Sequence, residues 1–401
     1  MMNAPRLRFK EFSDKFESVT LGKVSDFYKG KGIAKAEISE DGVTPCIRYG
    51  ELYTKYGVII EKALSRTNTP KSSLVLSQAN DVIIPASGET QVDIATASCV
   101  MSSGIALGGD LNIIRSKQNG VFLSYYLNSK KKLDIAKLAQ GNSVVHLYAS
   151  QLRTLELNLP KFEEQKKIAT FLSSVDQKIT LLTKKYELLI QYKKGVMQKI
   201  FNQEIRFKDK AGKYFPEWKT LPLCEVAQII GGGTPETSVQ GNWGGDVQWF
   251  TPTELKQKYV SKSVRTITTA GLANSSAKLL PAGTVLFSSR ATVGDVAISL
   301  NECCTNQGFQ SFVMKSGYNN EFLYYWIANN KKLFLEKASG STFLEISKRE
   351  IEKLLIQAPC IDEQKRVADF LVSIDLAIEL NQHKLDLTKQ YKQGLLQQMF
   401  I

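Results

Sequence analysis

The chain has 401 residues, with 52 Lys+Arg against 39 Asp+Glu and a formal net charge of +13. At roughly 100–200 residues per domain, this length predicts two or three domains, and a hydrophobic content of 43% excludes a wholly disordered or collagen-like chain. No stretch approaches about 18 uninterrupted apolar residues, which excludes a transmembrane helix, and no apolar segment typical of a secretion signal follows the first basic residues. We therefore expect a soluble protein of the cytoplasm whose charge favours a nucleic acid over a membrane as partner.

The first predicted region, residues 1–160, has a mixed pattern. Short β-rich runs at Ser73–Leu76 and Asp81–Ile84 are separated by Gly, Asn, Asp and Pro, which are typical of turns. A helical pattern follows at Phe122–Leu138. These features predict a domain of mixed α and β structure.

A long helix is predicted next, over residues 161–205. Pro160 stands where a proline can precede a helix, and acidic residues follow that suit the positive end of the helix dipole. Apolar residues then recur on alternating steps of four and three, with Lys193 as an interruption, and this spacing is typical of a coiled-coil seam. The seam residues expected to pack are Ile168, Leu172, Val175, Ile179, Leu182 and Leu189.

The second half of the chain repeats this order. A variable region at 206–358 contains a β-rich run at Gly283–Phe287 and a helical pattern at Glu321–Ala338, and a second long helix is predicted over 359–401. Pro160–Phe201 returns without a gap as Pro359–Phe400, with about 19 identical positions. Asn381, Thr388 and Lys392 interrupt the second seam. Its expected packing residues, with Asn381 as a polar member, are Val367, Leu371, Ile374, Ile378, Asn381 and Leu385.

These elements predict an α+β fold with a pseudo-twofold internal repeat: two mixed α/β domains joined by two long helices packed as an antiparallel coiled coil. Each helix of some 38 residues would reach roughly 57 Å. A buried polar Asn381 near Tyr186 would then fix the register of the two helices. The alternative is that each apolar stripe packs only against the domain of its own half.

A search for catalytic motifs finds none. The chain has no phosphate-binding loop, nucleophile elbow, zinc-protease helix or dinucleotide-binding glycine motif, and Gly231–Gly233 favours a turn. Neither an acidic cluster of the nuclease type nor the Asn/Asp-Pro-Pro-aromatic motif of amino-methyltransferases can be found. Only two histidines occur, and the six cysteines are scattered. We therefore expect no catalytic residue and no metal site, and interpret the cysteines as reduced structural thiols.

Candidate binding residues are basic, aromatic and amide side chains in predicted loops. Lysines alternate with glycines from Lys29, which would bring ammonium and backbone groups close to phosphates. Arginine and amide side chains are the types that read guanine and adenine edges. The alternatives are that the aromatic rings belong to the core and that the lysines only solvate a face. The candidate DNA-binding residues are Lys29, Lys31, Arg48, Tyr49, Lys55, Tyr56, Trp243, Gln248, Trp249, Lys256, Arg290, Asn306 and Gln307.

The repeated helix carries a recognisable signature. The pattern P-x-x-x-E-Q-x-x-[IV]-A-x-F-L-x-x-x-D occurs at Pro160–Asp176 and at Pro359–Asp375, and each copy ends in a Y-K-x-G-x-x-Q helix. Arg8-Phe9-Lys10 is also similar to Arg206-Phe207-Lys208. With Val285–Gly294 and Thr305–Gly308, the chain resembles the specificity (S) subunits of type I restriction-modification systems. The first half departs from that pattern, with Ile83–Gly88 and Ser103-Gly104 in the corresponding places.

The resemblance implies a non-catalytic subunit of a bacterial defence system. Each variable region would be a target-recognition domain that reads one half of a gapped, asymmetric double-stranded DNA target. The helices would set the spacer and dock modification (methyltransferase) subunits, two by family analogy, which methylate adenine N6. Restriction subunits would cleave and translocate DNA. The chain itself would hold no cofactor, because S-adenosylmethionine, ATP and Mg would bind to the partners.

Two other classes of function remain as rivals. A structural coiled-coil scaffold, in which the charge only aids solubility, predicts weak DNA binding without sequence preference. A stand-alone nuclease predicts metal-dependent cleavage by the purified chain.

Overall fold

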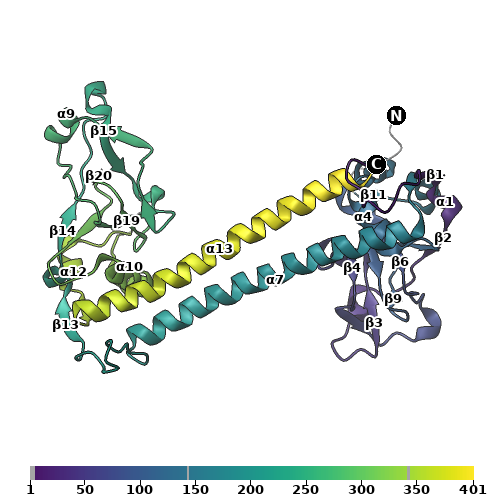
Figure 1. Cartoon of the computed structure of the whole chain (residues 1–401), viewed down its shortest axis with the longest axis horizontal. Coiled ribbons are helices and arrows are strands. Elements are labelled where there is room, and N and C mark those ends of the chain that lie inside the picture. Colours follow the sequence, from purple (N-terminus) through teal and green to yellow (C-terminus); the bar gives the residue numbers. More distant parts are fainter. Residues whose placement is uncertain (1–4, 142–143, 341–343) are drawn as a thin grey trace. The chain divides into compact units, whose positions relative to one another are not determined.

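The structure, a computed structural model, describes residues 5–141, 144–340 and 344–401. It divides into two compact units: the first holds the chain up to Thr183 together with His383–Ile401, and the second holds Lys184–Gln382. Two long helices, α7 (Phe162–Phe201) and α13 (Ile361–Met399), each contribute one half to either unit. Both helices are labelled in Figure 1.

The strands of the first unit form four small sheets. They are β1 (Glu17–Thr20), β2 (Ser25–Lys29), β3 (Thr44–Ile47), β4 (Ile59–Ile60), β5 (Ser65–Thr67), β6 (Asp81–Pro85), β7 (Ser87–Gly88), β8 (Ser98–Val100), β9 (Ala106–Leu107), β10 (Leu111–Ser116), β11 (Val145–His146) and β12 (Glu156–Leu159). The largest sheet has the order β2-β10-β6-β8-β4, and a three-stranded sheet has the order β5-β3-β9. Strands β1 and β12, and β7 and β11, form antiparallel pairs.

The first unit also contains six short helices and two 3-10 turns in its described part. In chain order they are α1 (Leu21–Val24), the 3-10 turn η1 (Lys35–Glu37), α2 (Tyr49–Thr54), the 3-10 turn η2 (Lys71–Ser73), α3 (Gln91–Ile94), α4 (Gly120–Asn128), α5 (Lys132–Leu138) and α6 (Ala149–Arg153). Asn119 caps α4, because its side chain accepts the Phe122 N–H at 2.9 Å. Helix α4 is buried on every side, with Phe122 and Tyr126 in the core of the unit.

The second unit repeats this sheet pattern. Its strands are β13 (Lys219–Pro222), β14 (Ala227–Gly231), β15 (Trp243–Phe250), β16 (Tyr259–Val260), β17 (Arg265–Ile267), β18 (Val285–Phe287), β19 (Val296–Ser299), β20 (Cys303–Thr305), β21 (Gln310–Met314) and β22 (Leu355–Ala358). The orders β14-β21-β18-β19-β16 and β17-β15-β20 match the five- and three-stranded sheets of the first unit position by position. Strands β13 and β22 pair as β1 and β12 do.

The helices of the second unit follow the same plan. They are α8 (Leu223–Val226), the 3-10 turns η3 (Gln240–Asn242) and η4 (Pro252–Glu254), α9 (Thr269–Ala273), α10 (Asn320–Asn329), α11 (Lys331–Lys337) and α12 (Lys348–Lys353). Helix α10 corresponds to α4 and is capped by Asn319 in the same way, with Phe322 N–H at 2.9 Å. The predicted repeat of mixed α and β structure is confirmed.

One predicted strand is wrong. Of the run Ser73–Leu76, Ser73 ends the 3-10 turn η2, and Leu76 makes only an isolated bridge to Ala106. Pro70 begins this turn with its fixed φ of -58°, and its carbonyl accepts the Ser73 N–H, so local turn geometry prevails over the β-propensity of the run. The predicted helical segments of both halves are each broken into two helices, α4 with α5 and α10 with α11.

The two long helices pack antiparallel within each unit. In the first unit, Ile168 and Leu172 near the start of α7 share a core with Leu395 and Met399 near the end of α13. In the second unit, the residues near the end of α7 share a core with those near the start of α13, including Ile200, Val367 and Leu371. The predicted antiparallel coiled coil is therefore confirmed. These cores also contain residues of each unit's own domain. Each apolar stripe therefore packs both against the other long helix and against the domain of its own unit.

Burial along the seam falls toward the middle of α7, whereas the middle of α13 keeps two buried seam residues. Ile168, Leu172, Val175, Val367, Leu371, Ile374, Asn381 and Leu385 are buried, and Ile179, Leu182, Leu189 and Ile378 are half-buried. Asn381 is 4% exposed, as a polar residue that fixes register would be. Its predicted neighbour, Tyr186, stays a prediction.

The lysines that interrupt the seam form equivalent polar triads. In the first unit, Lys392 Nζ lies 2.6 Å from Asp176 Oδ1, and the Tyr125 hydroxyl donates to Asp176 Oδ2 at 2.6 Å. In the second unit, Lys193 and Tyr325 contact Asp375 at 2.5 Å each. Each triad joins three elements, the buried helix of the domain and both long helices. The aspartates are the last residues of the repeated sequence signature, which explains their place in it.

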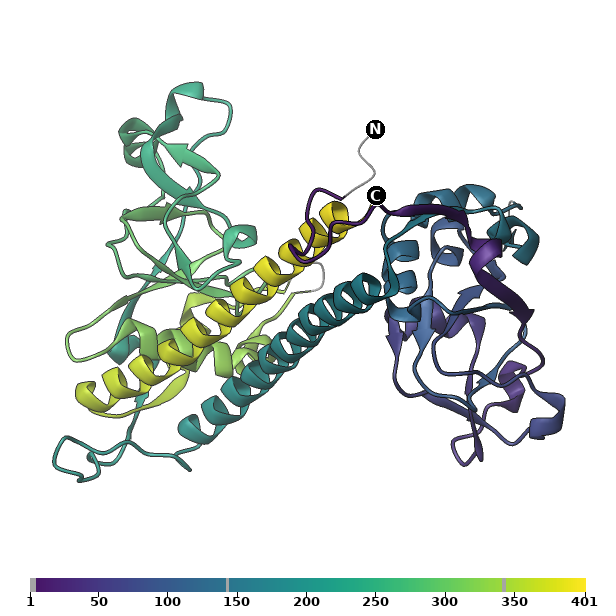
Figure 2. The same cartoon turned by 45° about the vertical axis from the view of Figure 1, so that its right-hand side comes forward.

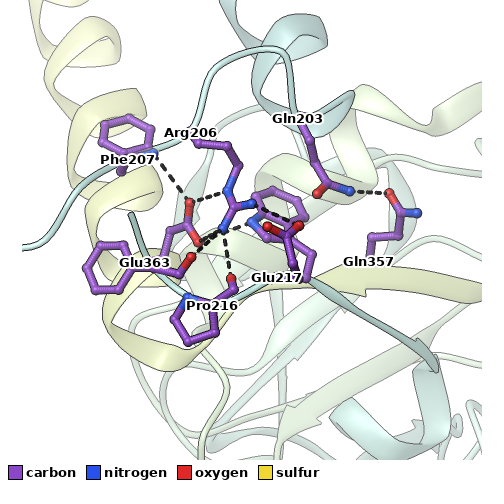
Figure 3. A network of polar contacts seen from close by, with 9 residues as sticks. Gln203, Arg206, Phe207, Pro216, Glu217, Gln357 and Glu363 are labelled. Carbon is purple, nitrogen blue, oxygen red and sulfur yellow. Dashed lines mark hydrogen bonds and ion pairs between the residues drawn. The ribbon is translucent and has the colours of Figure 1, made fainter. Parts of the chain in front are cut away.

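The Glu-Gln pair of the signature ties each long helix to its domain. Gln165 and Gln364 each donate to a proline carbonyl one turn earlier, at 2.9 and 2.8 Å. Glu363 is fully buried and accepts bonds from the Arg206 guanidinium at 2.8 and 3.0 Å and from Trp218 Nε1 at 3.1 Å. Figure 3 shows this network, with Arg206 at its centre. Glu164 accepts two bonds from Arg8 in the first unit, at 2.8 and 2.7 Å.

The segment around Leu7 in the first unit has the same place as the segment around Ile205 in the second, where the chain continues directly from α7. Ile205 N–H donates to the Lys199 carbonyl as the chain leaves α7, and in the first unit Leu7 N–H donates to the Gln398 carbonyl of α13 at 3.0 Å. Figure 2 shows this purple segment beside the yellow end of α13. In the first unit, Leu7 thus lies beside α13 where the second unit has Ile205 beside α7, and Arg8 and Arg206 form equivalent ion pairs with Glu164 and Glu363.

Candidate nucleic-acid interface

In the first unit, five segments meet at one edge of the five-stranded sheet. Lys31 N–H donates to Leu107 O at 3.0 Å, Gly109 N–H to Gly32 O at 2.8 Å, and Gly108 N–H to Ile47 O at 2.9 Å. Ala86 N–H donates to Asp110 O at 2.7 Å, and Leu147 N–H to Ala86 O at 2.9 Å. We call residues 29–33, 47–49, 85–88, 107–110 and 145–148 the loop edge of the first unit.

Four of these five backbone bonds have equivalents in the second unit and define its loop edge. Gly233 N–H donates to Thr305 O at 2.8 Å, and Asn306 N–H to Phe250 O at 3.0 Å. Ser289 N–H donates to Gly308 O at 2.8 Å, and Ile346 N–H to Ser289 O at 2.9 Å. This loop edge comprises residues 231–234, 249–251, 288–291, 305–309 and 344–347.

This equivalence corrects one sequence assignment. Gly108 and Asn306 follow matching parallel strand pairs, Ile47 with Leu107 and Phe250 with Thr305. The counterpart of Thr305–Gly308 is therefore residues 107–110, and the prediction of Ser103-Gly104 is wrong. Sequence comparison alone could not place these loops, because their side chains have diverged while the backbone bonds remain.

One glycine in each loop edge is required by close packing. A Cβ on Gly30 would lie 1.9 Å from the Gly108 carbonyl oxygen, and a Cβ on Gly232 would lie 2.0 Å from the Asn306 carbonyl oxygen. No side chain fits at either place without moving the backbone. The predicted turn at Gly231–Gly233 is thus the end of strand β14 pressed against a second loop.

Three of the five non-glycine residues with a left-handed φ in the described part of the chain lie at the loop edges. Ile33 has a φ of 64°, Asp110 of 59° and Ala291 of 63°, in the left-handed region that glycine tolerates best. Such residues cost about 1–3 kcal/mol each and are found chiefly where a site needs a particular backbone course. The left-handed conformation is least favourable for Ile33, because this buried residue is β-branched. This strain marks the loop edges as candidate functional surfaces.

The structure brings together four of the six candidates of the first unit. Lys29 and Lys31 are exposed. Arg48 lies half-buried beside Gly108, and half-buried Tyr49 follows it as the first residue of α2. The other two lie beyond the end of α2, where internal bonds hold them. Lys55 Nζ contacts Glu51 at 2.9 Å, and the Tyr56 hydroxyl accepts the Leu64 N–H at 2.7 Å.

In the second unit, three candidates lie on the loop-edge surface. Gln307 is exposed and its Oε1 accepts the Thr234 hydroxyl at 2.5 Å, while Asn306 Oδ1 accepts the Gly308 N–H at 2.9 Å. Arg290 is exposed on the neighbouring segment. Trp249 is different: it is 4% exposed and donates from Nε1 to the Gly233 carbonyl at 2.9 Å, so this ring is a core residue that supports the loop edge.

The remaining candidates of the second unit lie on or after strand β15. Trp243 packs edge-on against Trp249, and Arg265, which the sequence did not single out, covers its ring at 3.6 Å. Gln248 Oε1 accepts the Ser263 N–H at 2.7 Å, a structural bond. Lys256 is exposed. No sequence signal marks Arg265, because strand pairing alone brings it to Trp243.

The other reactive groups are structural. In the described part of the chain, no group of three or more His, Cys, Asp or Glu side chains is arranged to hold a metal ion, and no helix is long and apolar enough to cross a membrane. Four cysteines, Cys46, Cys99, Cys303 and Cys304, are buried, and burial raises the pKa of the Cys99 and Cys303 thiols to about 12. These thiols stay protonated and inert at neutral pH.

Fold and site together define a recognition protein built twice on one plan, with the two copies joined by paired helices. The family model for the type I restriction modification DNA specificity domain matches residues 13–191 and again 216–389. The chain therefore belongs to this family, whose members are DNA-recognition subunits and not the catalytic ones.

Individual relatives agree. The chain is 32% identical over 207 residues to the Methanocaldococcus jannaschii type I restriction enzyme MjaIX specificity subunit, a match that covers 50% of this chain and 48% of that one. It is 23% identical over 403 residues to the MjaVIII specificity subunit of the same organism, covering 95% and 91%. The crystal structure of a type I restriction-modification S subunit from M. genitalium shares the fold, with a TM-score of 0.62, 15% identity and 99% of both chains covered.

Proposed function

We propose that this protein is the specificity subunit of a type I restriction-modification complex, and that each loop edge reads one half of a gapped, asymmetric double-stranded DNA target. The observation that carries the proposal is the pairing of one scaffold with two different surfaces. Four backbone bonds of the loop edges are the same in both units, whereas Lys29-Gly30-Lys31-Gly32 in one stands against Gly231-Gly232-Gly233-Thr234 in the other. Two related but unequal surfaces suit two different half-sites.

The side chains divide into two roles. Lys29 and Lys31, exposed beside glycine backbone, would bind phosphates and position the first unit on the duplex. In the second unit Arg290, Asn306 and Gln307 carry the donors and acceptors that discriminate base edges. Arg265, stacked on Trp243, adds positive charge next to the loop edge.

The helices would hold the two recognition units at a set spacing and dock the modification subunits. A second apolar stripe supports the docking role: Leu181, Leu188 and Tyr192 on α7 are exposed, and the equivalent Leu380, Leu387 and Tyr391 on α13 are exposed as well. In the first unit, a hollow of about 390 Å³ lies beside Leu387 and Tyr391 and is also lined by Val175 and Lys178. An exposed apolar stripe beside a hollow is typical of a helix-binding surface.

The chemistry would belong to the partners. We infer that adenine N6 methylation with S-adenosylmethionine takes place in modification subunits, two of them by family analogy, and that restriction subunits use ATP and Mg. The target base must leave the helix to reach a methyltransferase site, so this chain would position it rather than modify it.

The first test is methylation-site mapping of DNA from cells that express the partner subunits with and without this chain. We expect N6-methyladenine within one gapped, two-part motif only when the chain is present. No new motif, with partners shown to be active beside another specificity subunit, would instead indicate a scaffold. Metal-dependent cleavage by the purified chain would indicate a nuclease.

The spacer role has its own test. Removing two whole turns at equivalent places from α7 and α13 shortens the pair by about 11 Å while keeping every face in phase. We expect both half-sites to be retained with a shorter spacer between them. An unchanged spacer in the mapped motif would show that the helices do not set it.

A further inference from the structure

One pair of facing residues in the two loop edges has the same backbone pairing but different side chains. In the first unit, β7 pairs with β11 so that Ser87 faces His146. In the second unit, an isolated bridge places Arg290 opposite Glu345. The flanking bonds fix the equivalence: Leu147 N–H to Ala86 O and Ile346 N–H to Ser289 O both measure 2.9 Å. A Ser/His pair and an Arg/Glu pair thus occupy one place on one scaffold.

The backbone at Arg290 is held in place. Its carbonyl accepts the Thr292 N–H at 2.8 Å and the Ser288 hydroxyl at 3.1 Å. The next residue, Ala291, has its left-handed φ of 63° and donates its N–H to Leu344 O at 3.0 Å. A residue kept in an unfavourable conformation by this many bonds gives the preceding side chain a defined starting direction.

The Arg290 side chain has an acidic neighbour, Glu345, that leaves its guanidinium available to a ligand. Arg290 Nε lies 3.7 Å from Glu345 Oε2, and the two side chains are 52% and 48% exposed. An exposed ion pair of this kind adds little stability, about 0–1 kcal/mol. Within the described part of the chain, neither terminal NH₂ group of Arg290 makes a hydrogen bond, so both keep their donors for a ligand. Those groups are the fork that binds guanine O6 and N7 in the major groove.

We propose that Arg290 reads a guanine in the second half-site and that Glu345 is the positioning residue that holds its guanidinium for this contact. The proposal rests on the function proposed above. In the first unit, exposed His146 stacks on exposed Tyr148 with ring centroids 6.3 Å apart, so the equivalent place presents rings and a hydroxyl instead of an arginine fork. This one position therefore gives the two half-sites different readout.

The test uses the full complex of this chain with its modification subunits and maps methylated motifs for four variants. For Arg290→Ala we expect the preference for guanine at one position of the second half-site to fall about tenfold or more, with the first half-site and the spacer unchanged. Glu345→Gln should weaken the same preference several-fold, and Glu345→Asp should restore most of it. A purely structural role for Glu345 would lower stability without changing base preference at a single position.

The matched control is Glu352→Gln. Glu352 pairs with Lys348 on α12 at the same 3.7 Å and with similar exposure, outside the loop edge. It should leave the motif unchanged. The inference is overturned if Arg290→Ala and Glu345→Gln also leave every position of the motif unchanged. Absence of any gapped motif with the unmodified chain would instead overturn the proposed function, so the two failures are distinguishable.

A transplant tests the equivalence directly. Ser87→Arg combined with His146→Glu should introduce a guanine preference at one position of the first half-site. A complex that still methylates with its original first half-site would contradict the claim that the two places correspond.

Discussion

The two units differ least where side chains are buried and most where the loop edges meet solvent. Both have the same strand order, the same Asp-Tyr-Lys triad and the same Arg-Glu pair. Their loop edges share backbone bonds but not side chains, with lysines at 29 and 31 where the second unit has glycines at 231 and 233. The comparison teaches that buried polar bonds keep the frame constant while exposed positions are free to diverge.

The physical reason is the unequal cost of change. Removing one partner of a buried, bonded charge leaves the other without compensation, which costs several kcal/mol. Changing an exposed side chain costs within about 0.5 kcal/mol of stability. A protein can therefore acquire a new recognition surface without losing its fold, provided the buried network stays intact.

The largest expected effect is on the buried glutamates. Glu363→Ala should lower the free energy of unfolding by about 3–5 kcal/mol because Arg206 and Trp218 lose their acceptor. All four tryptophans lie between residues 218 and 326, inside the second unit, so their fluorescence in a urea titration reports that unit. The equivalent Glu164→Ala should shift the circular dichroism transition and leave the fluorescence transition in place.

The control for this pair is Glu217→Ala. Glu217 also contacts Arg206, at 3.4 Å, but its side chain is 90% exposed, so the change should cost under about 0.5 kcal/mol. Equal losses for Glu217→Ala and Glu363→Ala would contradict the view that burial decides the constant frame.

A smaller effect is expected from the triads. Asp176→Asn and Asp375→Asn should each cost about 1.5–3 kcal/mol, the range for hydrogen bonds to a charged group. A double-mutant cycle of Asp176→Asn with Lys392→Met, followed by urea unfolding, measures the coupling directly. Asp369→Asn, at an exposed position of α13, is the matched control. Additive changes in the cycle would mean that the contact adds nothing to stability.

Removing the lysines should change DNA binding and not folding. If Lys29 and Lys31 both bind phosphates, Lys29→Ala with Lys31→Ala should reduce the slope of log affinity against log salt by about 2 and weaken all sequences alike. Lys62→Ala is the control, since this exposed lysine follows β4 at the opposite end of the sheet. Titration of the complex at several salt concentrations measures the slope. An unchanged slope would show that the lysines only solvate their loop.

The smallest effect concerns the thiols. Exposed Cys224 and Cys360 should react with a thiol reagent at pH 8, whereas the four buried cysteines should not, which mass spectrometry can count. Burial raises the pKa of Cys46 and Cys304 to about 11, above the ordinary value of about 8.5. The folded state therefore binds more protons, and stability falls only as the pH rises above about 8.5. More than two fast-reacting thiols at pH 8 would contradict the buried assignment.

Much of the frame could be predicted because it repeats. Two copies of one signature gave both long helices, their antiparallel pairing and the double unit. The surface was harder. Trp249 is an aromatic residue among polar and basic ones, which is typical of a binding loop, but tertiary packing buries it. Lys55 and Tyr56 lie near Arg48 in sequence, yet local bonds engage them.

The sequence by itself determined the repeat, the helix seams, the basic charge and the family, since these depend on spacing and identity along the chain. Only the tertiary structure decided which loops meet, because Glu345 reaches Arg290, and Gly108 reaches Arg48, through strand pairing between distant segments. It also explained why lysines interrupt an apolar seam, because each lysine pairs with a half-buried carboxylate of the other long helix that no local pattern reveals. Periodicity along the sequence indicates which side of a helix is buried, and long-range contacts decide which residues that side packs against.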